Sequence, residues 1–121
     1  MNHRKNLIMN SIQLVISLIL ITSCHPKKDT IVDKEKIVGR WILVNAHYSQ
    51  IEFTKTEQFD YAQGNLMASF NYEIDDNNIL TAVNKKDHQD IYKYRITKLT
   101  DDSLIWKYVP TNYEMKYFRK K

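Results

Sequence analysis

The stretch Met67 to Asn84, MASFNYEIDDNNILTAVN, decides the fold class of this chain of 121 residues. Every second residue from Ala68 to Ile74 is apolar or aromatic, and a period of two is typical of a strand with one buried face. Asp75-Asp76-Asn77-Asn78 then interrupts the pattern with residue types that favour tight turns. A second apolar segment, 79–84, follows directly. The stretch therefore predicts two antiparallel strands joined by a short turn.

The same alternation recurs on both sides of this hairpin. Strands are expected near 40–47, 51–53, 59–61 (with Phe59 and Tyr61 two residues apart), 67–74, 79–84, 92–96, 104–108 and 113–117. Polar clusters separate them, at Lys55-Thr56-Glu57, Gln63-Gly64-Asn65, Lys85-Lys86-Asp87, Thr100-Asp101-Asp102 and Pro110-Thr111-Asn112. Regular spacing with short turns predicts an all-β protein, an antiparallel up-and-down barrel of about eight short strands, because closure removes the exposed sheet edges. A helical turn over 33–38, with Asp33 as its N-cap, is expected before the first strand.

Residues 1–24 predict export. A basic start at 3–5 precedes a mostly apolar run, 7–21, and small residues lead to Cys24, the only cysteine. Such a segment is typical of a secretory signal. An uncleaved membrane anchor is the weaker alternative, because polar residues interrupt the run and a spanning helix needs about 20 mostly apolar residues.

The approach to Cys24 resembles the lipobox of bacterial lipoproteins, in which the cysteine is acylated and the chain is cut just before it. The resemblance implies a signal peptide over 1–23, a membrane partner reached through a lipid on Cys24, and a lipidated tether over 24–36. The residue directly after Cys24 is His25 and not Asp, and no acidic run follows. By analogy with lipoprotein sorting, we expect a lipid-anchored protein of the cell envelope, in the outer membrane and facing the periplasm.

Composition limits the possible partners and the chemistry. Loss of 1–23 would remove Arg4 and Lys5 and lower the formal net charge by two from +4. A nucleic-acid partner is not expected for an exported domain of such balanced charge. A lipidated Cys24 would leave no thiol for a disulfide or a nucleophile. No cofactor is expected, because two glycines in the whole chain cannot build a Gly-rich phosphate loop.

Gly39-Arg40-Trp41 opens the first expected strand. It is similar to the Gly-x-Trp opening of lipocalin-like barrels, and the chain as a whole resembles the lipocalin-like domain of small bacterial lipoproteins. That resemblance spans 37–121, the expected barrel domain. It implies that Trp41 plugs the barrel floor and that Arg119, at the end of the last strand, packs across Trp41 as a structural cation–π pair.

No catalytic arrangement stands out, so an enzyme is not expected and no catalytic residue is assigned. Asp87-His88-Gln89-Asp90 places a His between carboxylates, which could hold a metal or exchange protons. We interpret it instead as a solvated hairpin turn and expect no metal site.

The late strands carry most of the aromatic side chains. If a ligand binds, those expected to line its site are Tyr92, Tyr94, Trp106, Tyr108 and Tyr117. The rings could instead fill a narrow eight-stranded barrel, and the short strands favour that interpretation. Two functions remain open. One is non-enzymatic binding of a small apolar or mixed-character ligand, or of a glycan. The alternative is an interaction or inhibitor module that contacts another envelope protein through its outer face or loops.

Overall fold

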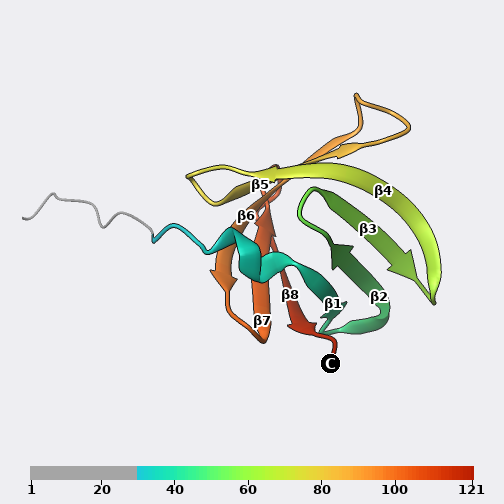
Figure 1. The fold of residues 1–121 in the computed structure, drawn as a ribbon, viewed down its shortest axis with the longest axis horizontal. Coiled ribbons are helices and arrows are strands. Elements are labelled where there is room, and N and C mark those ends of the chain that lie inside the picture. The colour runs from blue at the N-terminus through green and yellow to red at the C-terminus, as the bar shows by residue number, and fades with distance from the viewer. Residues whose placement is uncertain (1–29) are drawn as a thin grey trace, which may run out of the picture.

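The computed structural model describes residues 30–121, which form a closed antiparallel β-barrel (Figure 1). The elements are a 3₁₀ helix η1 (Lys34–Ile37), β1 (Gly39–Leu43), β2 (Ala46–Phe53), β3 (Glu57–Ala62), β4 (Asn65–Ile74), β5 (Ile79–Asn84), β6 (Ile91–Leu99), β7 (Ser103–Tyr108) and β8 (Tyr113–Arg119). Each strand pairs with the next, and β8 pairs with β1 opposite Trp41. The predicted fold class is confirmed. Within 30–121, none of the helical structure is long and apolar enough to cross a membrane.

The turns form where the sequence places residues that tolerate a positive φ. Gln63 and Gly64 have φ values of 52° and 79°, the two successive positive angles that a tight hairpin turn requires. Asn78 has a φ of 62°. In the same turn, the Asp75 carboxylate accepts hydrogen bonds from the backbone N–H groups of Asn77 and Ile79, at 2.9 and 3.0 Å. These local bonds explain why the DDNN sequence reverses the chain.

The first predicted strand is too long. β1 ends at Leu43, the chain turns at Val44 and Asn45, and β2 begins at Ala46, so His47 belongs to β2. This turn contains no glycine and no residue with a positive φ. Asn45 is therefore its only residue of a type that marks tight turns, and one such residue is a weak signal.

In β3 the interior face is polar. Gln58 is 2% exposed and Asp60 points the same way, so Phe59 and Tyr61 lie on the outer wall. Cations cover both rings: Lys85 lies 5.2 Å from the Phe59 centroid, and Arg40 lies 4.6 Å from that of Tyr61. In this strand the alternating aromatic residues therefore lie on the outer face of the barrel and not on the core face.

The core fills the barrel with large side chains from nearly every strand. The largest fully buried side chains are Trp41, Trp106, Phe53, Ile37, Leu80 and Leu104. Ile37 belongs to η1, so the helical turn contributes to the same core. Residues 30–36, which the sequence assigns to the tether, thus lead directly into the packed domain.

The barrel has two different ends. We call the end with η1 and the turns 54–56, 75–78 and 100–102 the floor, and the end with the turns 44–45, 63–64, 85–90 and 109–112 the mouth. In Figure 1 the β4–β5 turn lies at the left near η1, whereas the β3–β4 and β5–β6 turns lie at the right.

Candidate functional site

Trp41 closes the floor. Its side chain is fully buried, and its indole Nε1 donates a hydrogen bond to the Ile37 carbonyl at 2.8 Å. The Arg119 guanidinium lies 4.3 Å from the Trp41 ring centroid, within the range of a cation–π contact. The indole N–H of Trp41 is therefore hydrogen bonded, and one face of its ring contacts a cation.

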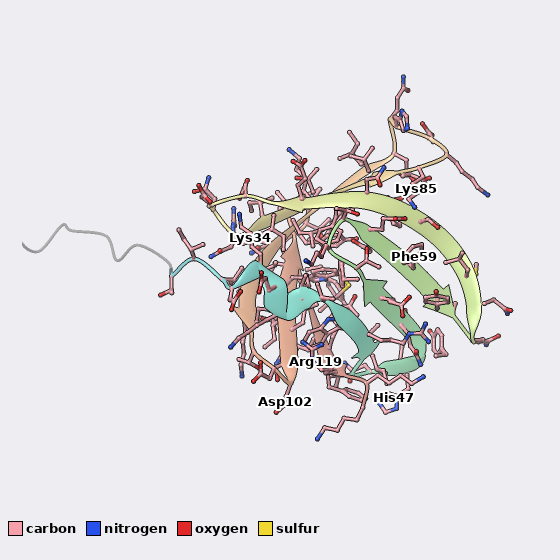
Figure 2. All side chains as sticks on the ribbon, in the orientation of Figure 1. Lys34, His47, Phe59, Lys85, Asp102 and Arg119 are labelled. Carbon is pink, nitrogen blue, oxygen red and sulfur yellow. The ribbon has the colours of Figure 1, made fainter. Side chains whose placement is uncertain are left out.

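Arg119 links the floor elements. It donates to the backbone carbonyls of Val38 at 2.8 Å, of Lys36 in η1, and of Asp101 in the β6–β7 turn. Figure 2 shows Arg119 below η1 and near the turn that carries Asp102. A Cβ on Gly39 would lie 2.3 Å from Arg119 Nη1, and Gly39 has a φ of 133°, so only glycine fits beneath this side chain.

The segment before η1 is hydrogen bonded to the floor. Asn78, 6% exposed, donates through Nδ2 to the Thr30 carbonyl and accepts through Oδ1 from the Val32 N–H, both at 2.9 Å. The chain that leads from Cys24 therefore joins the barrel at its floor.

A cavity of about 280 Å³ lies in the mouth half of the barrel. Three rings form its apolar wall, those of Phe70 on β4 and of Tyr92 and Tyr94 on β6. Gln58 and Asp60 on β3, Asn84 at the end of β5, and Asp90 just before β6 supply its polar atoms. The cavity is therefore lined by aromatic rings with polar side chains next to them.

The polar atoms of the cavity are mostly acceptors. Gln58 Nε2 donates to Asp60 Oδ1 at 3.0 Å, which leaves Gln58 Oε1 without a partner within 30–121. Asn84 Nδ2 donates to Asp90 Oδ2 at 3.1 Å. No Lys, Arg or His is among the described residues that line the cavity.

The electrostatics follow from this composition. Burial raises the pKa of Asp60 above its ordinary value of 3.8, and the hydrogen bond from Gln58 only partly offsets that rise. Asp90 raises the pKa of the Tyr92 hydroxyl by hydrogen bonding and by its charge. Burial raises the pKa of Tyr94, and Asp60 adds to the effect. The cavity therefore disfavours further negative charge.

The structure separates the five aromatic residues that the sequence proposed as ligand-lining. Tyr92 and Tyr94 line the cavity. Trp106 is 1% exposed and stacks behind Tyr94, with ring centroids 4.3 Å apart, and Tyr117 packs edge-on against Trp106. Tyr108 contacts both cavity tyrosines, at centroid distances of 5.5 and 6.4 Å. The three residues Trp106, Tyr108 and Tyr117 thus support the wall from behind.

Sequence reasoning missed the polar half of the cavity. Gln58 and Asp60 alternate with Phe59 and Tyr61 in β3, and the apolar pattern of the sequence indicates only the two aromatic residues. The sequence places Asp90 in a solvated turn with Asp87 and His88, of which His88 is indeed exposed. Within 30–121, no three potential metal-ligating side chains converge.

A larger open groove of about 1120 Å³ lies outside the barrel wall, between η1, the β2–β3 turn and strands β4 and β5. Its charged side chains Lys34, Glu35, Lys55 and Glu73 are exposed. Because these groups are solvated and none of the late-strand aromatic residues contributes, we assign the candidate site to the interior cavity.

No protein-family model matches this chain, and no curated protein matches its sequence. Among solved structures, the chain is similar to a lipocalin-like protein from Bacteroides uniformis, with a TM-score of 0.55 and 13% sequence identity. The match covers 71% of this chain and 99% of that one. At this identity the likeness concerns the fold, which is therefore a closed eight-stranded barrel with a lipocalin-like structural neighbour.

Proposed function

We propose that this protein is an envelope-anchored lipoprotein whose barrel binds a small ligand without chemical conversion. The supporting observation is the cavity in the mouth half, which combines three aromatic rings with a few convergent polar groups. Small-molecule sites are usually concave, mostly apolar and fixed in orientation by a few such groups. The mouth of a β-barrel is a common place for them.

The size of the cavity limits the ligand. At about 280 Å³, it lies just below the range of roughly 300–1,000 Å³ that is usual for ligand pockets. Sterols and haem-like rings are too large for it. Because both apolar and polar groups line the space, a compact ligand of mixed character suits it better than a bare hydrocarbon.

The proposed anchor also orients the cavity. Thr30 and Val32 are bound to the floor, and Cys24 lies only a few residues earlier in the chain. A lipid on Cys24 would hold the floor towards the membrane, so the mouth would face the periplasm. Cys24→Ala is expected to release the protein from the membrane fraction or to leave the precursor uncut. Equal partitioning and equal N-terminal mass of the two forms would contradict anchoring.

Ligand binding is tested by titrating the mature domain with small aromatic alcohols, amines and monosaccharides, followed by tryptophan fluorescence. Trp106 stacks on Tyr94, so a ligand against Tyr94 should change the Trp106 signal. Tyr92→Ala should weaken the response, whereas the matched variant Tyr48→Ala, an exposed tyrosine that does not line the cavity, should not. No response to any compound at near-millimolar concentration would contradict the binding function.

The exposed apolar side chains favour a second candidate function, contact with another envelope protein. Seven of the ten large apolar side chains that are exposed within 30–121 lie at the mouth end. They include Val44, Tyr48, Leu66, Met67, Ile91 and Tyr113. A large share of exposed apolar residues at one end of a domain favours a protein-binding surface there. Cross-linking in intact envelopes should then capture a stoichiometric partner, and Met67→Ser with Tyr113→Ser should abolish its capture.

A further inference from the structure

The orientation of the Gln58 side chain determines what the cavity can accept. Gln58 is 2% exposed, and its Nε2 donates to Asp60 Oδ1 at 3.0 Å. This bond turns the amide so that Oε1 has no hydrogen-bond partner within the described residues. Buried acceptors are normally paired, so the unpaired Gln58 Oε1 leaves this part of the cavity lining short of a hydrogen-bond donor.

Two carboxylates reinforce the requirement for a donor. Asp60 shares the Gln58 side of the cavity, and Asp90 lies at its outer end beside Asn84 and Tyr92. No cationic side chain lines the same space within 30–121. A carboxylate that is partly buried without a cation is held in an unfavourable environment, which a positively charged ligand would relieve.

The aromatic rings of the cavity can also attract a positive charge. Phe70 and Tyr92 meet edge to face with centroids 5.7 Å apart, and Tyr94 lies next to Tyr92 along the inner face of β6. Aromatic faces attract organic cations and also pack against apolar carbon. A bare metal ion would gain little from these rings, because hard cations prefer a shell of oxygen ligands.

Resting on the proposed ligand-binding function, we propose that the cavity binds a small organic amine in its ammonium form. The ammonium group would donate to the Asp60 carboxylate, and its apolar arm would pack against Phe70, Tyr92 and Tyr94. A fatty acid or another carboxylate would meet Asp60 and Asp90 with like charge. The cavity therefore discriminates by charge among ligands of equal size.

Isothermal titration calorimetry with three matched compounds tests this proposal: 2-phenylethylamine, 2-phenylethanol and phenylacetate. We expect the amine to bind at least about tenfold more tightly than the alcohol, because charge-assisted hydrogen bonds are roughly twice as strong as neutral ones. Phenylacetate should bind most weakly. Asp60→Asn should remove the preference of the protein for the amine over the alcohol.

Asp87→Asn is the matched control. Asp87 lies in the same β5–β6 turn region as Asp90, but it is exposed and does not line the cavity. Its carboxylate accepts a hydrogen bond from the Gln89 N–H, which an Asn side chain can also accept. Asp87→Asn removes the same charge near the mouth and should leave all three affinities unchanged.

The possible outcomes separate this proposal from the proposed function. If the alcohol binds as tightly as the amine, or if Asp60→Asn leaves the preference intact, the ammonium proposal is overturned while ligand binding stands. If the amine does not bind at 10 mM, the ammonium proposal is also overturned. The fluorescence titration with neutral compounds then decides the binding function independently.

Discussion

The two tryptophans of the barrel have contrasting environments. Trp41, at the floor, donates its indole N–H to the Ile37 carbonyl and lies under the Arg119 guanidinium. Trp106, behind the cavity wall, is equally buried, but its indole N–H has no partner within 30–121. An unpaired buried donor costs about 1–3 kcal/mol. The contacts at the floor therefore stabilise the fold, whereas the mouth half leaves polar groups without hydrogen-bond partners near the cavity.

The charged groups show the same difference. At the floor, Arg119 is paired with three backbone carbonyls and one aromatic face. In the cavity, Asp60 receives one hydrogen bond, from a neutral amide, and the partners of Asp90 are the neutral groups of Asn84 and Tyr92. Unsatisfied polarity concentrated at one end of a barrel is consistent with a binding site at that end.

The largest expected effect belongs to the floor. Trp41→Ala should lower the free energy of unfolding by about 3–5 kcal/mol, the usual cost of removing a large buried aromatic side chain. Small domains are stable by only about 5–15 kcal/mol, so the urea midpoint should fall sharply. A loss of less than about 1 kcal/mol would mean that Trp41 does not hold the floor closed.

A smaller loss is expected for Arg119. Arg119→Ala removes three charge-assisted hydrogen bonds and the cation–π contact, and we expect a loss of about 2 kcal/mol because water can reach the freed carbonyls. Arg119→Lys keeps the charge, but an ammonium group cannot bind the three carbonyls as the planar guanidinium does. This variant should therefore be more stable than Arg119→Ala and less stable than wild type. Full recovery by lysine in urea unfolding would show that charge alone matters.

Asp60→Asn should raise the free energy of unfolding at neutral pH, because it removes the cost of burying a charged carboxylate. The pKa of Asp60 is raised in the folded state, so the folded protein binds the proton more tightly than the unfolded chain does. Wild-type stability should therefore fall as the pH rises from 3.8 through this raised pKa. The variant, which has no ionisable group there, should melt at a higher temperature than wild type at neutral pH.

The same pair of proteins should melt alike below pH 3.8, where Asp60 is protonated in both the folded and the unfolded chain. Asp90, Tyr92 and Tyr94 face the same cavity in both proteins, so the comparison isolates the contribution of Asp60. If the difference in melting temperature did not depend on pH, the buried charge of Asp60 would not be the cause of that difference.

Much of the fold could be predicted from the sequence because most strands follow one rule. In β4, β5 and β7, alternating apolar residues face the core, and turns rich in Asp, Asn and Gly separate the strands. The rule is weakest at Val44-Asn45, where Asn45 is the only such residue and neither turn residue has a positive φ. It also misleads in β3, where Lys85 and Arg40 cover Phe59 and Tyr61 on the outside.

Only part of the aromatic lining of the candidate site could be predicted from the sequence. Tyr92 and Tyr94 share the inner face of β6 by simple alternation, so the sequence could place them together. Gln58 and Asp60 join them only because the sheet curves from β3 through β4 and β5 to β6. The proximity of these two pairs of residues depends on the three-dimensional shape of the sheet, and no local pattern in the sequence indicates it.

The central claim is that the floor is closed and the mouth half binds the ligand. The most direct test is a ¹⁵N NMR titration of the mature domain with 2-phenylethylamine, following the side-chain amides of Gln58 and Asn84 and the two indole N–H signals. We predict shifts for Gln58, Asn84 and Trp106 and none for Trp41, which lies at the far end. Equal shifts of both indole signals, or a shift of Trp41 alone, would contradict the account.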